Sequence, residues 1–357
     1  MYNMGSVISG SGCYIPPIVD NEAFADKQFF DTRGRAIAGE TAELIRKFEK
    51  ITGIRSRGYA PPELVASDLA ITAARNAIAD AAIDAESLSQ VIVAHNFGNV
   101  SSVSSQVVAV PTLAARVKQS LQIRNPSCIA YDIQFGCAGW IQAMIQADVF
   151  IRSGAAEHCL VIGADTVSRV VDKSDRDSLI FSDGAGAVIL SASSDHYSGI
   201  LASISQSWTY DEADYIDMGN SNDPSLDNVG LFLKMDGRPV YDLIVRIVPQ
   251  LLKDCMVKAN LRLADIKKIF VHQANAVMDT EIIKSFYKLF GVDAIPESAM
   301  PSTVAEFGNS SVATLPTMLD MVRKGSMPGH SLSSGDVILF ASFGAGMSVN
   351  VMCYKQP

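Results

Sequence analysis

The sequence predicts an α/β protein built from two duplicated halves, and two observations support this prediction. Short runs of β-branched residues alternate with amphipathic stretches, a pattern typical of βαβ units on a mostly parallel or mixed sheet. In addition, three segments of the first half recur in the same order in the second, namely 89–96 in 267–274, 135–139 in 307–311, and 182–188 in 342–348. We therefore expect an N-terminal half over residues 1–197 and a C-terminal half over residues 198–357.

The first half is expected to begin with a strand over residues 5–14. Pro16 and Pro17 end it, because proline has no backbone N–H to donate to a sheet. The elements expected next are helices over 43–50, 67–82, 112–121 and 140–151, and strands over 91–94, 128–133 and 159–162. The Asp-Gly-Ala-Gly segment at 183–186 is predicted to be a tight turn into a further buried strand.

The segment 198–229 interrupts this pattern. It is rich in Ser, Asp, Asn and Gly, so we interpret it as the connection between the halves together with surface loops. The elements expected after it are helices over 241–259, 277–290 and from 309 to about 323, and strands over 269–272, 337–342 and 348–354.

The composition is that of an ordinary globular enzyme. The 357 residues suffice for two domains or one large fused core, and a content of 48% hydrophobic and 19% charged residues argues against disorder. The net charge of −9 argues against a broad nucleic-acid surface. Residues 1–12 lack the pattern of a signal peptide, and no apolar run is long enough for a membrane helix. We therefore expect a cytoplasmic protein.

The cysteines are scattered, with no spacing typical of a zinc site. We expect free thiols, mostly buried as small apolar side chains, with no metal and no cofactor. The exception is Cys137, whose Gly136-Cys137-Ala138-Gly139 segment forms a tight turn at the start of a predicted helix. A helix N-terminus favours a thiolate through its dipole and its free N–H groups, so Cys137 is the candidate nucleophile.

His272 and Asn309 are the candidate partners of Cys137. His272 ends an apolar strand, and Asn309 occupies the turn that matches the Cys137 turn in the other half. If the halves pack about a pseudo-twofold axis, the three side chains meet. One nucleophile and two hydrogen-bond donors predict stabilisation of an oxyanion rather than a charge relay. The backbone N–H groups of Cys137, Gly344 and Ala345 are further candidates for that oxyanion hole.

These residues resemble the 3-oxoacyl-(acyl-carrier-protein) synthase III family, condensing enzymes of the thiolase superfamily. The resemblance spans nearly the whole chain. It is carried by the Cys137 turn and by further motifs at 52–55, 163–169, 182–187, 272–275, 307–311 and 344–346. It implies a five-layered αβαβα thiolase-like fold, a homodimer, and acyltransferase activity in two half-reactions. Cys137 takes an acyl group from a thioester, and a malonyl- or 3-oxoacyl-carrier protein then condenses with it while His272 and Asn309 stabilise the enolate.

The resemblance also implies binding residues. Arg169 and Phe307 are expected to contact substrate, while Lys267, Lys268 and Lys284 are expected to help dock the acyl-carrier protein. Housekeeping members carry a Trp and an Arg that hold coenzyme A, and this chain has Lys47 and Ile51 at those positions. They also carry an Arg used for docking the carrier protein, and this chain has Val277 there. Residues 31–46 resemble an added segment near the tunnel mouth.

These departures favour an acyl-carrier protein as the acyl donor, although acyl-CoA stays open as an alternative donor. They also favour a role in specialised metabolism. The chain is similar to ketosynthases of dialkylresorcinol or flexirubin biosynthesis, which join two acyl chains and cyclise them to a cyclohexanedione. His272 is the expected base for ring closure, with Glu306 as a weaker candidate.

Alternative functions were weighed against this one. The first is housekeeping fatty-acid initiation from acetyl-CoA and malonyl-carrier protein, and the second is a non-catalytic partner subunit of a condensing complex. A thiolase is rejected because its second reactive cysteine is missing from the turn at 343–346. A papain-like hydrolase is rejected because its Cys-Gly-Ser-Cys-Trp signature is absent.

Overall fold

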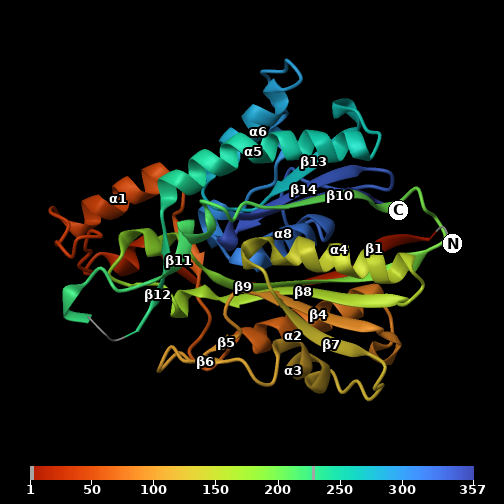
Figure 1. Cartoon of the computed structure of the whole chain (residues 1–357), viewed down its shortest axis with the longest axis horizontal. Helices are drawn as coiled ribbons and strands as arrows, with labels where there is room; N and C mark the ends of the chain where they lie inside the picture. The colour runs from red at the N-terminus through yellow and green to blue at the C-terminus, as the bar shows by residue number, and fades with distance from the viewer. Residues whose placement is uncertain (1–3, 227–229) are drawn as a thin grey trace.

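The chain folds into five layers, as the family resemblance implied. We describe a computed structural model over residues 4–226 and 230–357. Two sheets lie roughly one above the other with helices between them, and further helices cover both outer faces (Figure 1). Residues 1–3 and 227–229, which include the end of the segment interpreted as a connection, lie outside the described residues.

The first sheet has the strand order β1-β9-β8-β4-β7. Its strands are β1 (Gly5–Tyr14), β4 (Gln90–His95), β7 (Ile129–Gln134), β8 (His158–Thr166) and β9 (Asp183–Ser193). β1 and β8 pair antiparallel with β9, while β4 pairs parallel with β8 and with β7.

The second sheet repeats this arrangement in the order β10-β15-β14-β13. Its strands are β10 (Gly199–Ser207), β13 (Ile266–Val271), β14 (Val337–Gly344) and β15 (Ser348–Lys355). β10 and β14 pair antiparallel with β15, and β13 pairs parallel with β14. Four strands of each sheet therefore share one pairing pattern, which confirms the predicted duplication at the level of topology.

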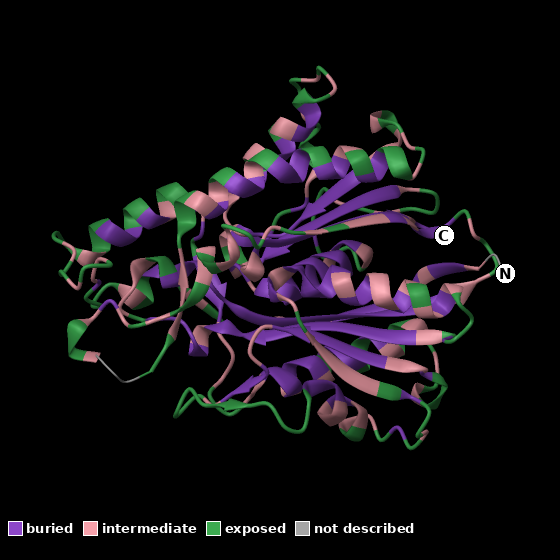
Figure 2. Cartoon of the chain, in the orientation of Figure 1, coloured by how far each residue is buried: buried purple, intermediate pink, exposed green. Residues whose placement is uncertain are grey.

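Helices fill the other three layers. α4 (Gly139–Arg152) and α8 (Thr314–Arg323) lie between the sheets. On one outer face are α2 (Ala66–Ala81) and α3 (Leu113–Ser120), and on the other α5 (Gly237–Lys258) and α6 (Ala276–Lys288) (Figure 1). Strands β9, β14 and β15 and the middle helix α8 are almost entirely buried, whereas α4 is buried over about half of its residues and the edge strand β7 is only partly covered (Figure 2). Trp140 and Met318 of the middle layer pack with Phe270 and Phe340 of the second sheet. No helix in the described part of the chain could cross a membrane.

Two expectations about the connections were wrong. Residues 199–207 form strand β10, although their polar composition had indicated a linker; one edge of β10 pairs with β15, so backbone hydrogen bonds hold a sequence with little apolar periodicity. Asp183 to Gly186 lie within β9, paired with residues 163–166 of β8, and do not form a turn. The connecting region also contributes to a small hairpin of β11 (Ile216–Gly219) and β12 (Phe232–Met235). The helix expected over 43–50 is α1 (Thr41–Thr52), which lies at one end of the molecule (Figure 1).

Glycines allow the two halves to approach closely. A Cβ atom on Gly163 of β8 would overlap the carbonyl group of Val312, just before α8. A Cβ atom on Gly186 of β9 would lie 2.6 Å from the backbone nitrogen of Thr317. The middle helix α8 therefore lies directly on the backbone of the first sheet.

We predict that Gly163→Ala destabilises the protein, because the new methyl group must displace the backbone before α8. Overpacking of this kind costs about 1–3 kcal/mol. The measurement is urea unfolding followed by circular dichroism. Gly237→Ala is the control: a Cβ atom there meets no atom within 4 Å. Equal stability of the two variants would contradict the close approach.

Candidate active site

A largely apolar cavity of about 430 Å³ lies at the carboxyl ends of β4, β7, β13 and β14. Cys137, His272 and Asn309 all line it, so side chains from both halves reach one place. Its apolar wall is formed by Phe97, Val167, Phe181, Ile216, Met218, Leu233, Met235, Val240 and Phe343. A cavity of this size and character is typical of a small-molecule site.

Cys137 lies in a one-turn 3-10 helix, Gly136–Ala138, that leads directly into α4. Gly136 has φ +58°, a conformation that glycine adopts without strain. The second half holds this turn in place: Ser342 Oγ donates to the Cys137 carbonyl at 2.8 Å, and Asn350 Nδ2 donates to the Ala138 carbonyl at 3.1 Å. The candidate nucleophile is therefore positioned by both halves.

The pKa of Cys137 is raised, whereas its position at a helix N-terminus had led us to expect a stabilised thiolate. Burial raises the pKa of the Cys137 thiol to about 12, and the nearby Asp165 carboxylate adds to the rise. A hydrogen bond with Ser311, at 3.3 Å between Sγ and Oγ, acts in the opposite direction. The thiol is therefore protonated at rest, and groups that stabilise the thiolate must act when it attacks.

His272 follows β13, where its backbone N–H donates to the Ala341 carbonyl at 2.8 Å. Its ring stands edge-on to Phe343, with centroids 5.2 Å apart. Burial lowers the pKa of His272 to about 3, so the imidazole is neutral at physiological pH. Among the described residues Nδ1 has no hydrogen-bond partner. A neutral ring of this kind can donate a hydrogen bond to an oxygen in the cavity.

Asn309 is fixed in a buried turn. Its backbone N–H donates to Ile180 at 2.9 Å, and its carbonyl accepts from Ser182 at 2.8 Å. Its side-chain oxygen Oδ1 accepts the backbone N–H of Ser311 at 2.9 Å. Because the oxygen is engaged in this way, the amide NH₂ is the group that Asn309 can offer to a substrate oxygen.

Gly344 brings the candidate oxyanion groups together. A Cβ atom there would overlap the backbone nitrogen of Cys137, and one on Gly136 would lie 2.8 Å from the nitrogen of Ala345. The backbones of Cys137, Gly344 and Ala345 all line the cavity. Glycine at position 344 therefore permits the contact between the two turns.

Other expected binding residues lie elsewhere. Arg169 is buried and donates to the carbonyl groups of Pro61, Leu64 and Val100, so its guanidinium holds these loops instead of facing a substrate. Phe307 is half-buried in α7 (Val304–Phe307) and is not part of the cavity wall, where Phe181 and Phe343 stand. Glu306 is exposed and pairs with Arg55, also outside the cavity wall.

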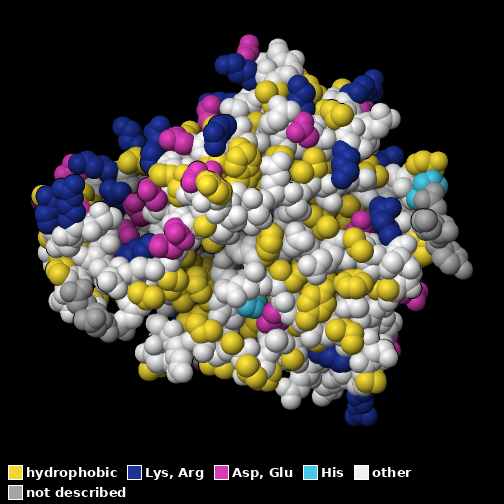
Figure 3. Space-filling model, viewed as in Figure 1, with side chains coloured by type: hydrophobic (Ala, Val, Ile, Leu, Met, Phe, Trp, Pro, Cys, Tyr) yellow, Lys and Arg dark blue, Asp and Glu magenta, His cyan; other side chains and the backbone are white. Residues whose placement is uncertain are grey.

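The three docking lysines are not equivalent. Lys268 is 2% exposed and donates to the Ser298 carbonyl, so it cannot meet a partner protein. Lys267 is exposed but stands at the start of β13, the opposite end from His272, whereas Lys284 is exposed on α6. Exposed Lys and Arg side chains gather instead at the end of the molecule that α1 occupies (Figure 3), where α1 carries Arg46, Lys47 and Lys50.

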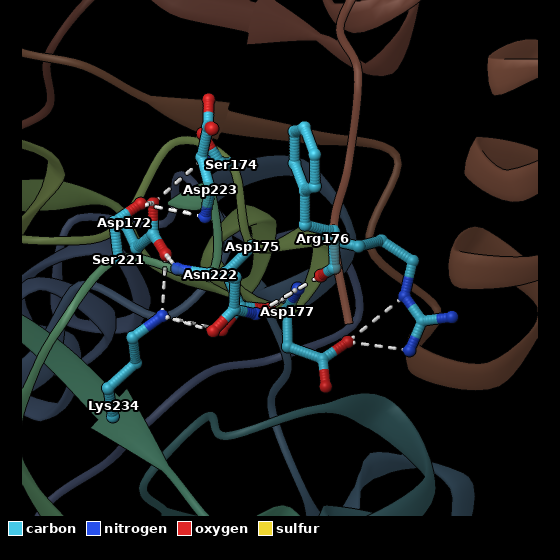
Figure 4. Close-up of polar contacts among 10 residues, drawn as sticks. Asp172, Ser174, Asp175, Arg176, Asp177, Ser221, Asn222, Asp223 and Lys234 are labelled. Carbon is cyan, nitrogen blue, oxygen red and sulfur yellow. Dashed lines mark hydrogen bonds and ion pairs between the residues drawn. The ribbon is translucent and has the colours of Figure 1, made fainter. Parts of the chain in front are cut away.

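The β11–β12 hairpin forms a wall that the sequence did not reveal. Its residues Ile216, Met218, Leu233 and Met235 line the cavity. Lys234 anchors it from outside, donating to Asp172 at 2.6 Å, to Asp175 at 3.3 Å and to Asn222 at 2.8 Å (Figure 4). The buried ion pair between Lys234 and Asp172 ties the hairpin to the first half. In the sequence, only the apolar-polar-apolar order at 233–235 indicated a strand here.

Sequence reasoning also missed Asn96 and Ser311, which line the cavity beside Cys137. Ser311 belongs to the predicted Asn309 turn, and Asn96 directly follows β4. Their position beside these motifs is the signal that could have identified them as site residues. The described residues hold no cluster of His, Cys, Asp or Glu that could bind a metal ion.

Comparison with known proteins agrees with this geometry. Models of 3-oxoacyl-(acyl-carrier-protein) synthase III and of its C-terminal region match residues 131–207 and 256–355, which carry Cys137, His272 and Asn309. The chain belongs to the 3-oxoacyl-(acyl-carrier-protein) synthase III family. It is a condensing enzyme of the ketosynthase III type, as found in fatty-acid and polyketide-type synthesis.

Solved structures of this family cover the chain almost completely. The synthase III of Aquifex aeolicus is 27% identical, with 98% of this chain and 100% of that chain covered and a TM-score of 0.78. The priming β-ketosynthase of a polyketide pathway is 27% identical, with 99% and 96% covered and a TM-score of 0.79. Cerulenin-bound OleA from Xanthomonas campestris shares the fold, at 17% identity, 98% and 97% coverage and a TM-score of 0.76.

We predict that the neutral, buried state of His272 makes the enzyme sensitive to acid. The imidazole has a pKa of about 6.5 when unfolded but about 3 when folded, so the unfolded chain binds a proton first as pH falls. Stability linked to His272 is thus complete above pH 6.5 and is lost between pH 6.5 and pH 3, by at most about 5 kcal/mol.

The measurement is urea unfolding at a series of pH values for wild type and His272→Asn. The wild type should lose more stability than the variant across this window. Parallel pH profiles would show that the folded imidazole titrates normally.

Proposed function

We propose that this enzyme is a β-ketoacyl synthase III-type acyltransferase that loads an acyl group on Cys137 and then condenses it with a malonyl- or 3-oxoacyl-carrier protein. The observation that carries this proposal is the convergence of Cys137, His272 and Asn309 on one apolar cavity. No metal or redox cofactor is needed for this chemistry, because the thioester and the carboxylate lost from a malonyl group supply the driving force.

In the loading step, the Cys137 sulfur attacks the carbonyl carbon of an acyl thioester. The thiol proton leaves with the departing thiol, so one thioester is exchanged for another. The tetrahedral intermediate places negative charge on the carbonyl oxygen. The backbone N–H groups of Cys137, Gly344 and Ala345 are proposed to stabilise it, because fixed donors in an enclosed site need no reorganisation during the reaction.

In the condensation step, the second substrate forms a carbanion next to its thioester carbonyl. A malonyl group does so by losing carbon dioxide, and a 3-oxoacyl group by losing a proton to a base. Its enolate oxygen is stabilised by the neutral His272 ring and by the Asn309 amide. The carbanion then attacks the acyl-Cys137 carbonyl, and the sulfur leaves as thiolate.

The lining of the cavity favours an acyl chain longer than acetyl. The β11–β12 hairpin, Phe181 and Val167 offer a long apolar surface that a two-carbon group leaves unfilled. This supports the dialkylresorcinol-type role, in which two acyl chains are joined. Ring closure then joins a second nucleophilic carbon of the product to its thioester carbonyl and releases the carrier thiol, with His272 as the base.

An acyl-carrier protein is the proposed donor and a homodimer the proposed assembly. A shallow groove is lined by Arg46, Glu49, Lys50, Gly53 and Arg55, of which Arg55 pairs with Glu306. Gly53 packs on Ala276 beside the His272 segment, and the excess of cations in the groove suits an acidic carrier protein. β7 ends the first sheet and exposes Ile129, which suits pairing with a second copy. The halves 1–197 and 198–357 are proposed as the two thiolase-like units, each containing one of the two sheets.

We predict that Cys137 gains an acyl mass from medium- and long-chain acyl-carrier protein faster than from acetyl-CoA, because the cavity wall is apolar and the usual coenzyme A contacts are absent. The measurement is intact-protein mass spectrometry after separate incubation with each donor. Faster loading from acetyl-CoA would support housekeeping fatty-acid initiation instead.

A second experiment separates the residue roles. Cys137→Ala should abolish loading, whereas Cys13→Ala should load normally, because Cys13 lies outside the cavity. Asn309→Ala and His272→Ala should load but lower the condensation rate by about 100- to 1,000-fold, the usual loss for one oxyanion donor. Normal condensation in both variants would contradict their assigned role.

A further inference from the structure

A chain of hydrogen bonds runs from a buried carboxylate to the Cys137 sulfur. Asp165 lies next to the last residue of β8 and accepts hydrogen bonds from the backbone N–H of Asn96 at 2.9 Å and from its side-chain Nδ2 at 2.6 Å. The same Nδ2 also donates to Ser311 Oγ at 2.6 Å. Ser311 Oγ in turn lies 3.3 Å from the Cys137 sulfur.

The direction of the first donors in this chain is set by Asp165. It holds Asn96 through two groups, so one amide hydrogen points to the carboxylate and the other to Ser311. The Ser311 hydroxyl hydrogen can reach either Asp165 or the Cys137 sulfur, and the sulfur becomes an acceptor for it when Cys137 is a thiolate. Hydrogen bonds to charged acceptors are stronger than neutral ones, so this donor favours the thiolate over the thiol.

The backbone at Ser311 supports a functional role for this side chain. Ser311 has φ +56°, a left-handed conformation that costs energy for any residue except glycine. The residue is 2% exposed, and its neighbour Ser310 bonds to Thr314 at 3.1 Å instead of to the site. A serine in a strained, buried position beside the nucleophile is consistent with a use for its hydroxyl.

Among the described residues, the surroundings of Cys137 offer no lysine or arginine for this task. None of the residues that line the cavity is Lys or Arg. The titratable groups around the sulfur are Asp165 behind Ser311, and His272 and Asp217 in the cavity wall. His95 lies near Asp165 but bonds to Asp132 at 3.1 Å. A thiolate in this cavity must therefore rely on hydrogen bonds and on the N-terminus of α4.

We infer that Ser311 is a catalytic residue that donates a hydrogen bond to the Cys137 thiolate, and that Asn96 and Asp165 are positioning residues that aim its hydroxyl. The inference rests on the proposed function for its role in acyl loading. In that step the Ser311 hydroxyl keeps its proton throughout, and the Cys137 thiol proton leaves with the departing thiol.

The test is the rate at which iodoacetamide alkylates Cys137, followed by peptide mass mapping between about pH 6 and pH 9. Ser311→Gly removes the hydroxyl and relieves the positive φ, so the variant should be at least as stable as the wild type. Its alkylation profile should shift upward by about one to two pH units, a rate loss of about 10- to 100-fold at a given pH. Asn96→Ala should shift it in the same direction but less. Asp165→Asn should give a smaller shift again, because it also removes a carboxylate that raises the Cys137 pKa.

Ser310→Ala is the matched control and should alkylate as the wild type does. An unchanged profile for Ser311→Gly would overturn the inference, and an unchanged profile for Asn96→Ala would overturn the positioning part. Alkylation needs no acyl substrate, so a shifted profile together with failure to load any thioester would count against the proposed function alone.

Discussion

The site depends on the contact between the Cys137 turn of the first half and the Gly344 turn of the second. A side chain at position 344 would overlap the Cys137 backbone, and Ser342 and Asn350 hold the same turn through its carbonyl groups. This contact places the nucleophile, the candidate oxyanion groups and the end of β14 in one location. Gly163 and Gly186 let α8 pack directly against the backbone of the first sheet, so they too bring the two halves into close contact.

Burial determines how such a site can work. It keeps His272 neutral and Cys137 protonated, because the charged form of each loses its hydration inside the protein. A neutral imidazole can donate to an enolate without first releasing a proton. The thiolate, by contrast, must be stabilised at the moment of attack. Directed hydrogen bonds are suited to this, since their strength grows where water is excluded.

The cavity wall is a second, independent feature. The β11–β12 hairpin brings apolar side chains to the acyl region, and its attachment by Lys234 to Asp172 and Asp175 lies on the opposite side of the strand. Alternation along β12 explains this division: Leu233 and Met235 face the cavity, and Lys234 between them faces the carboxylates. Substrate range can therefore change in this hairpin without altering the catalytic turns.

The sequence by itself determined the duplication, the other strands of both sheets, the main helices, and the Cys137, His272 and Asn309 motifs. It could do so because apolar periodicity and turn residues are local properties of the chain. Only the tertiary structure decided that β10 is a strand, that Arg169 binds loop carbonyls, that Lys268 is buried, and that Asn96 and Ser311 meet Cys137. Each of these depends on contacts between residues far apart in sequence, and a residue's type does not reveal which distant backbone will satisfy its hydrogen bonds.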